Sequence, residues 1–501
     1  MGGRSLHPAE RRYTVLYFRR MSGLDTDIAP LLPSPDTIPP RPFFRVWATW
    51  LATGLVAVLV AYVFGLSSSD PLDHLTSPEH SLERLAGRDM ELRSAVAHAR
   101  PWERHLYSLL SGGDDGVDDW VRWHEELAQS SGAPDVELDR LILLGEAGRT
   151  AAVRESLEEW EPEDEAAARR KEWAAAAYLT PSLARAEGRA LVTEVRDELP
   201  AGWFADALVA RLARRSGDTV ARQQAEAAIA TRGGALLRRW RGLQAAGVLL
   251  AVAGLATLAT MALSRRDPRI ANARLLDSLS LRDAYALFIR GALGFLVLGA
   301  GLGLLIPDES ALDAITAPVT VAPILLCALW YVKAQGLSFT DAFGLAPIGG
   351  RWAPIAWVAL GLIGLQLTGE TVIGAALDAL HLTSHWADGL QENLIWGSWG
   401  FVVRESVDSV IWAPLGEEVA FRGVLYAGLR SQFGLAPAAA ISAALFAVAH
   451  GYGVQGFVAV FWSGAIWALA YEKTGSLWPG IIAHGVGNLM ATAGVIALLR
   501  M

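Results

Sequence analysis

Nine apolar runs dominate this sequence of 501 residues, and all but the short run Pro437–His450 are close to the length of a membrane-spanning helix. A helix rises about 1.5 Å per residue, so roughly 20 apolar residues cross a hydrocarbon core of about 30 Å. The runs are Val46–Leu66, Leu243–Leu263, Tyr285–Ile306, Thr316–Val332, Pro354–Leu377, Ser409–Leu429, Pro437–His450, Gly456–Tyr471 and Trp478–Leu499. Hydrophobic residues make up 52% of the chain, which is more than an ordinary soluble protein carries. The sequence therefore predicts an all-α polytopic membrane protein with about nine transmembrane helices in a lipid bilayer.

The composition changes sharply after the first run. Residues 67–240 are rich in Ala, Glu, Asp, Arg and Leu, and pieces such as "LDRLILLGEAGRTAAVRESLEEW" have helical spacing of their apolar positions. We therefore predict a soluble α-helical domain inserted between the first and second spans. The expected order is a Pro- and Arg-rich N-terminal segment (1–45), the first transmembrane helix (46–66), this domain (67–240) and a multi-helix membrane domain (243–501). Residues 390–403 suit a helix at the membrane interface better than a tenth span.

The charge of the short loops orients this array, because cytoplasmic loops retain an excess of Arg and Lys. The N-terminal segment and the loop 264–284 are rich in arginine, whereas "PDESALDA" (307–314) and the loop 378–393 contain no Arg or Lys. The N-terminus is therefore predicted to be cytoplasmic and the soluble domain extracytoplasmic. The alanine- and arginine-rich, lysine-poor composition favours a bacterial source, so the expected location is the inner or plasma membrane of the cell.

Net charge argues against nucleic-acid binding, and cysteine content excludes disulfides and cysteine-based metal sites. A formal charge of −9 argues against nucleic acid as a partner, because such proteins need a basic surface to displace counterions from phosphates. The only cysteine, Cys327, has no second thiol to pair with, so neither a disulfide framework nor a cysteine-based metal site is possible.

One of the apolar runs carries three charges. In "APLGEEVAFRGVLY" (413–426), Glu417, Glu418 and Arg422 stand where hydrocarbon is expected. Each charge at mid-bilayer costs on the order of 2.5–3.5 kcal/mol, so these residues should face a protein-lined, hydrated cavity. Glu418 and Arg422 are four residues apart and can pair along one helix face, while Glu417 points about 100° away. One carboxylate is thereby neutralised and the other is left free.

Two histidines within apolar helices, His450 and His484, are candidate partners of the free carboxylate. His484 and Asn488 are four residues apart, so both can donate hydrogen bonds towards one point. A carboxylate, a histidine and two convergent donors make a plausible hydrolytic site, with a base that activates water and a hole for the oxyanion. A purely structural ion pair remains the alternative for the charges. A further carboxylate, Glu370, is expected to form hydrogen bonds between helices rather than to act in catalysis.

These motifs resemble those of a known family. "EEVAFR" (417–422), "FAVAH" (446–450) and "HGVGN" (484–488) occur in this order, each on an apolar helix, as in the CPBP family of CaaX-processing and bacteriocin-processing (Abi) intramembrane glutamic proteases. "GLSFTDAFGL" (336–345) is similar to a segment that such proteins carry upstream of their core. The resemblance covers roughly residues 270–501 and does not reach the soluble domain or the first span.

The resemblance implies an endopeptidase that hydrolyses peptide bonds of membrane-associated proteins or peptides. Glu417 and His450 would activate water, His484 and Asn488 would stabilise the oxyanion, and Glu418 and Arg422 would be structural or would tune Glu417. No cofactor is implied, with zinc held by histidines and glutamates as the alternative. The alternative function is a catalytically silent scaffold, immunity or transport protein of the same fold. The soluble domain is a candidate binding surface for a protein partner.

Overall fold

The computed structural model describes residues 44–66, 72, 75–110, 116–264, 268–306, 309–382 and 384–500. These residues form helices joined by short connections, and no strand occurs among them. The expected N-terminal segment (1–45) lies almost wholly outside the described residues. Five of the described helices are long and apolar enough to cross a membrane, and they span Thr219–Ser264, Leu281–Leu305, Ala353–Ala379, Val454–Thr474 and Trp478–Arg500. Shorter apolar helical stretches are Val46–Ala61, Pro318–Ala334 and Leu435–Ala449. The all-α, polytopic membrane class is therefore confirmed.

Between the first apolar helix, α2 (Val46–Leu66), and α11 (Thr219–Ser264) lies a series of polar helices, which we call the polar helical region. It consists of α3 (Pro78–Ala97), α4 (Pro101–Leu110), α5 (Gly116–Ser131), α6 (Pro134–Glu146), α7 (Thr150–Glu159), α8 (Glu165–Tyr178), α9 (Arg185–Glu198) and α10 (Trp203–Arg215). Apolar residues at helical spacing, such as Leu138, Leu141, Trp173 and Leu208, face inward and are fully buried. The region therefore has its own hydrophobic core.

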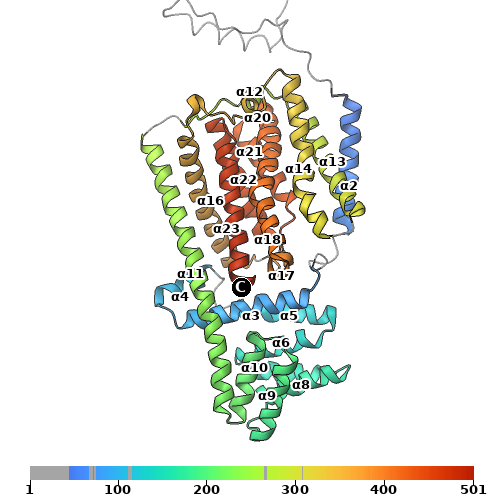
Figure 1. Cartoon of the computed structure of the whole chain (residues 1–501), viewed down its shortest axis with the longest axis vertical. Helices are drawn as coiled ribbons and strands as arrows, with labels where there is room; N and C mark the ends of the chain where they lie inside the picture. Colours follow the sequence, from blue (N-terminus) through green and yellow to red (C-terminus); the bar gives the residue numbers. More distant parts are fainter. Residues whose placement is uncertain are drawn as a thin grey trace, which may run out of the picture. The chain divides into compact units, whose positions relative to one another are not determined.

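A single helix, α11, connects this region to the apolar bundle (Figure 1). Its 46 residues correspond to a length of about 69 Å. One part of α11 packs on α3 and α10, and another part packs on α16 (Ala353–Ala379). At the second contact a Cβ on Gly254 would lie 2.6 Å from the Cα of Gly364, so the two backbones touch. The domain boundary expected at 240–243 falls inside this helix, because "RRWRGLQAAG" contains no proline and neither of its glycines adopts the positive φ that would end a helix.

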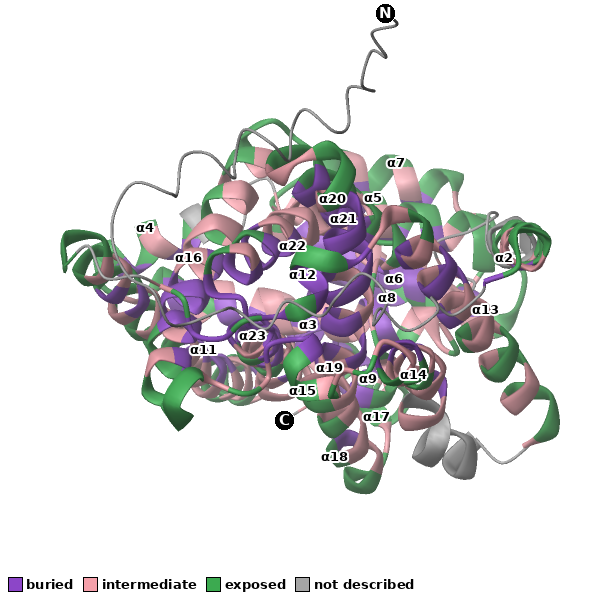
Figure 2. Ribbon diagram, turned by 90° about the horizontal axis from the view of Figure 1, so that it is seen from above, coloured by how far each residue is buried: buried purple, intermediate pink, exposed green. Residues whose placement is uncertain are grey.

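The other helices of the bundle are α12 (Arg274–Ser278), α13 (Leu281–Leu305), α14 (Glu309–Ala334), α15 (Phe339–Ala342), α16, α21 (Leu435–Ala449), α22 (Val454–Thr474) and α23 (Trp478–Val495). Large aromatic side chains, among them Phe343, Tyr426, Phe446 and Tyr471, are fully buried between them. The buried residues gather along the inner faces of these helices, whereas much of α2 is exposed (Figure 2). An exposed apolar face is expected where lipid takes the place of water.

The charged motif lies on a long, interrupted helix. It begins with α18 (Trp399–Val407), passes through the π-helical segment η4 (Asp408–Trp412), α19 (Ala413–Glu417) and a second π-helical segment, η5 (Glu418–Tyr426), and ends with α20 (Ala427–Phe433). The interfacial helix expected at 390–403 is therefore wrong in part. Only α17 (Glu392–Trp396) is separate, because Ser398 caps a new helix by accepting a hydrogen bond from the Phe401 N–H.

The polar helical region contacts the bundle at the start of α17 and at the loop that precedes it. The Glu392 carboxylate accepts hydrogen bonds from the Ser77 N–H at 3.0 Å and from the Ser81 hydroxyl at 2.7 Å. Both donors belong to the start of α3, where unpaired N–H groups and the helix dipole favour a negative charge. Trp386 of the same loop packs against the apolar cluster of Leu82. The segment 384–397, which includes α17, therefore lies at the end of the bundle that faces the polar helical region.

Candidate active site

The ion pair expected within the charged motif is present. Arg422 Nη1 donates to Glu418 Oε1 at 2.7 Å, and the two side chains are 0% and 1% exposed. The guanidinium also stands over two rings, 4.2 Å from the centre of Phe446 and 4.9 Å from that of Trp467. A buried charge is tolerated only where an opposite charge and further polar or π contacts replace water. Glu418 supplies the opposite charge and the two rings supply the π contacts, while Arg422 Nε and Nη2 are buried without a hydrogen-bond partner among the described residues.

Glu417 lies beside this pair but differs from it. Its side chain is 31% exposed, but its Oε2 atom is buried and has no hydrogen-bond partner among the described residues. His484 of α23 stands between the two carboxylates, with Nδ1 3.3 Å from Glu418 Oε1 and Nε2 3.7 Å from Glu417 Oε2. Trp467 stacks on the His484 ring at 4.4 Å and fixes its plane. The site thus holds one fully paired carboxylate and one accessible carboxylate on either side of an imidazole.

The π-helical segment η4 determines where Asn488 points. In this segment the Ala413 N–H donates to the carbonyl of Asp408, five residues back, and Pro414 has no N–H to offer. The carbonyl of Ser409 is therefore free to accept a hydrogen bond from the Asn488 amide at 2.7 Å. The expected convergence of His484 and Asn488 on one point is thus not seen, because each side chain has a different partner. A primary amide has a second N–H, so Asn488 keeps a donor for another ligand.

His450 follows the end of α21 and is half-buried. Its Nδ1 lies 2.8 Å from the carbonyl of Phe446, a contact that requires Nδ1 to carry the proton and makes Nε2 the acceptor of the neutral ring. The Phe446 ring touches both histidines, with its centre 4.6 Å from that of His450 and 5.8 Å from that of His484. The structure therefore brings Glu417, Glu418, Arg422 and His484 into one cluster, which His450 joins through Phe446.

Potential metal ligands do not cluster in the described part of the chain. No three His, Cys, Asp or Glu side chains of these residues are close enough to hold an ion. In the loop before α17, His385 contacts the polar helical region: its side chain is 17% exposed, its Nε2 lies 3.7 Å from Glu126, and its ring touches Trp123.

Sequence patterns gave little sign of Trp467. Tryptophans near helix ends are expected as interface anchors, but this one lies in the middle of an apolar helix, "SGAIWALAYE". That position was the only signal that could have identified it. Its stacking partner, His484, is distant in the sequence, so the contact leaves no periodic pattern.

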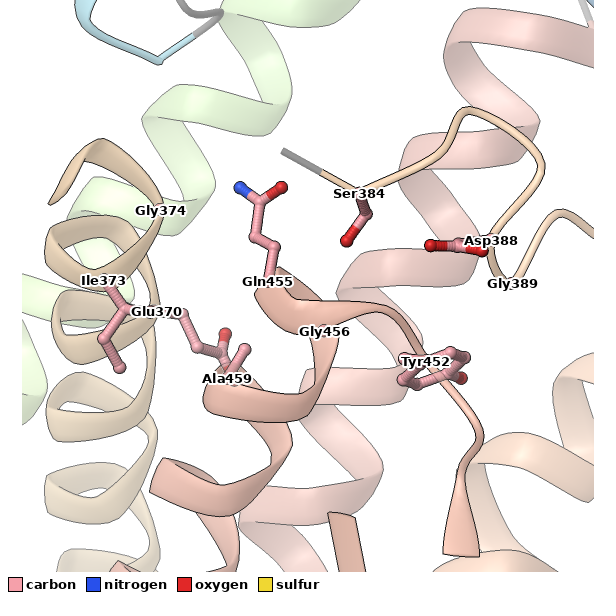
Figure 3. Close-up of a pocket in the computed structure, with 10 residues that line it drawn as sticks. All are labelled: Glu370, Ile373, Gly374, Ser384, Asp388, Gly389, Tyr452, Gln455, Gly456 and Ala459. Atoms are coloured by element: carbon pink, nitrogen blue, oxygen red, sulfur yellow. The ribbon is translucent and has the colours of Figure 1, made fainter. Parts of the chain in front are cut away.

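Glu370 of α16 forms a second polar site, and the hydrogen bonds between helices expected for it are present. Its Oε1 atom accepts from Ser463 of α22 at 2.9 Å and from Gln366 at 3.0 Å. Glu370 also lines a cavity of about 370 Å³ between α16, the start of α22 and the loop 384–389 (Figure 3). Tyr452, on the opposite wall, has its ring centre 5.5 Å from that of His450. The cavity therefore adjoins the histidine of the candidate site.

Comparison with protein families adds one finding. Residues 398–490 match the family model described as "Rce1-like: Type II CAAX prenyl endopeptidase Rce1-like". The matched segment contains all six candidate site residues, from Glu417 to Asn488, and it confirms the family resemblance seen in the sequence. No curated protein and no solved structure matches the chain significantly. Together with the long apolar helices, the match identifies an integral membrane protein.

Proposed function

We propose that this chain is an intramembrane endopeptidase acting on membrane-associated proteins or peptides, because its residues 398–490 match the family model of Rce1-like type II CAAX prenyl endopeptidases. The observation that carries the proposal is the contrast between two adjacent glutamates. Glu418 is fully buried and paired with Arg422, whereas the Glu417 side chain is partly exposed and has one buried oxygen without a hydrogen-bond partner among the described residues. A carboxylate that is held at the edge of a buried polar cluster without a cation of its own is suited to act as a base.

In the proposed mechanism, Glu417 and the Nε2 atom of His450 hold a water molecule, and Glu417 takes its proton as the oxygen attacks the peptide carbonyl. The carbonyl oxygen then carries the negative charge of the tetrahedral intermediate, which the second N–H of Asn488 stabilises together with His484, whose Nε2 donates when the ring is an imidazolium. Collapse of the intermediate breaks the C–N bond, and the proton held by Glu417 passes to the leaving amine. Glu418 and Arg422 fix the helix and the position of His484. No metal takes part, so the reaction should withstand chelation.

The membrane arrangement that we propose has nine spans. These are the five long helices, the three shorter apolar stretches and the interrupted helix from Trp399 to Phe433. The arginine-rich loop around 264–284 then faces the cytoplasm, and the polar helical region forms an inserted extracytoplasmic domain of a bacterial inner or plasma membrane protein. His450 and Tyr452 stand near the loop that this region contacts, so the active site opens to the same side. A domain in this place is suited to recruit a substrate or a partner protein.

The test uses purified full-length protein in detergent and a library of quenched-fluorescent peptides. We expect the wild type to cleave a subset of peptides, and we expect Glu417→Gln and His450→Ala to reduce kcat/KM by about 100-fold or more. Glu405→Gln, an equally conservative change in α18 of the same interrupted helix, should retain activity. Chelator should change nothing. Full activity of Glu417→Gln would refute the proposed mechanism, and loss of wild-type activity with chelator would assign the site to zinc. A folded wild type that cleaves neither the library nor membrane-inserted peptides would favour the silent scaffold.

A further inference from the structure

The cavity beside His450 has chemistry that the proposed mechanism does not use. Its walls come from three parts of the chain. These are Glu370 of α16, Ser384 and Asp388 of the loop 384–389, and Tyr452 with the first turns of α22 (Figure 3). Two of the lining residues are acidic and none is basic. A space lined by one sign of charge and walled by apolar helices concentrates the field on whatever enters it.

Glu370 is the residue in this cavity that most needs an explanation. It belongs to an apolar helix, and only the neutral donors Gln366 and Ser463 contact its carboxylate among the described residues. An ionisable group at membrane depth without an opposite charge is costly and usually marks a pathway or binding site. At Glu418 the same cost is met by Arg422 within the chain. At Glu370 no basic side chain of the described residues takes this place, so a cation that entered the cavity would find an unpaired acidic group.

Asp388 and Ser384 complete the polar wall in different ways. The Asp388 carboxylate accepts from the His385 N–H at 3.2 Å and lies close to Gly453, the residue that precedes α22, so the start of that helix already favours its charge. The Ser384 hydroxyl is buried and has no partner within the described residues. The cavity therefore contains three polar groups in different situations. The start of α22 stabilises the charge of Asp388, no basic side chain of the described residues balances Glu370, and the Ser384 hydroxyl has no hydrogen-bond partner among them.

From this arrangement we infer that the cavity is a subsite for a basic side chain of the peptide substrate, with Glu370 as the specificity-determining residue. The inference rests on the proposed peptidase function. It places a lysine or arginine within a few residues of the bond that is cut, since Tyr452 contacts the cavity on one side and His450 on the other.

Other occupants fit the cavity less well. A volume of about 370 Å³ is far larger than the roughly 30 Å³ share of a single water, and it falls in the range of pockets that bind organic groups. A lipid or prenyl chain would bury the Glu370 carboxylate against hydrocarbon without any cation, which is strongly unfavourable. A basic side chain instead supplies an aliphatic stem for the apolar walls and a cation for Glu370.

The experiment compares matched peptides that differ only at one position, with lysine, glutamine or norleucine placed in turn at each position around the cleaved bond. For the wild type, we expect lysine at one of these positions to raise kcat/KM by about tenfold or more over glutamine, as for a hydrogen bond to a charged group. In Glu370→Gln this ratio should fall to about one. Asp378→Asn, a change in the same helix at a residue outside the cavity lining, should keep the wild-type ratio.

A binding measurement separates this inference from the proposed function. The same peptides, labelled with a fluorophore, are titrated against Glu417→Gln and against the double variant Glu417→Gln/Glu370→Gln, with anisotropy as the readout. Tighter binding of the lysine peptide that is lost in the double variant supports the subsite, even where the wild type cleaves no peptide and the peptidase function fails. Cleavage without lysine preference at any position, or a preference for norleucine, overturns the subsite and leaves the peptidase function standing. Absence of both cleavage and lysine-selective binding overturns both.

Discussion

Two buried histidines, one in the apolar bundle and one in the polar helical region, have opposite surroundings. His484 is 4% exposed and has a carboxylate near each ring nitrogen. His124 is 1% exposed; its Nδ1 bonds to the carbonyl of Trp120, its Nε2 atom has no partner within the described residues, and its ring faces Phe204. Burial alone therefore does not indicate chemistry. What distinguishes His484 is a pair of carboxylates, one of which is accessible.

The same contrast holds for the charges of the two regions. In the bundle, Glu418 and Arg422 are withdrawn from solvent together. In the polar helical region, ion pairs such as Arg149 with Asp118 remain about half exposed. A pair in solvent contributes little to stability, whereas a buried pair becomes a large liability when one partner is removed. Substitutions in the two regions should therefore differ in size and in kind.

The largest effect is expected from Arg422→Met. It leaves the Glu418 carboxylate buried without a cation, and it should lower the free energy of unfolding by about 3–5 kcal/mol. The double variant Glu418→Gln/Arg422→Met should regain most of this loss because no charge remains. Denaturant unfolding in detergent, followed by tryptophan fluorescence, measures both.

Arg149→Met is the matched variant from the polar helical region, and its cost should stay below about 1 kcal/mol. Equal destabilisation by Arg422→Met and Arg149→Met would remove the contrast between the regions. A double variant no more stable than Arg422→Met would mean that Arg422 acts through its contacts with Phe446 and Trp467 rather than through its charge.

The second prediction concerns Asn488. If its free N–H stabilises the oxyanion, Asn488→Ala should lower kcat by about 100- to 1,000-fold and leave KM nearly unchanged, because the contact forms only in the transition state. Asn393→Ala, at an exposed asparagine in α17, is the control and should retain kcat. An unchanged kcat together with lower stability would show that Asn488 serves only to satisfy the Ser409 carbonyl.

Local patterns predicted much of the fold. The first apolar run and α2 have the same bounds, and Pro354–Leu377 lies within α16, because the length and composition of an apolar run are local properties. The pairing of Glu418 with Arg422 also follows from local spacing, since residues four apart share a helix face. The resemblance of residues 398–490 to a CAAX endopeptidase family was likewise visible in three short motifs.

Contacts between distant residues were not predictable. No local pattern connects Trp467 with His484, or Glu392 with the start of α3, because these contacts depend on how whole helices pack. The partner of Asn488 was missed for a related reason. It depends on the π-helical segment before Pro414, which shifts one hydrogen bond and frees a carbonyl that an ideal helix would satisfy. The roles assigned to the six site residues stay predictions until the variants are measured.

The smallest effect is expected at His124 and depends on pH. Burial lowers the pKa of His124 from 6.5 to about 4. The unfolded chain then binds more protons than the folded one between these values, so the stabilising effect of keeping His124 neutral is complete above pH 6.5 and is lost as the pH falls towards 4. At pH 5 the loss amounts to about 2 kcal/mol. His124→Gln removes the titrating group and should therefore reduce the acid sensitivity of unfolding by this amount.

Denaturant unfolding at pH 7.5 and pH 5 compares the wild type with His124→Gln and with His105→Gln, which replaces an exposed histidine of α4. The difference between the two pH values should shrink only in His124→Gln, because carboxylates that titrate in the same range contribute equally to all three proteins. Equal shrinkage in His105→Gln would assign the effect to net charge. If the difference between the two pH values shrinks in neither variant, His124 reaches solvent before the region unfolds. The two histidines would then differ only in the side chains that contact them and not in burial.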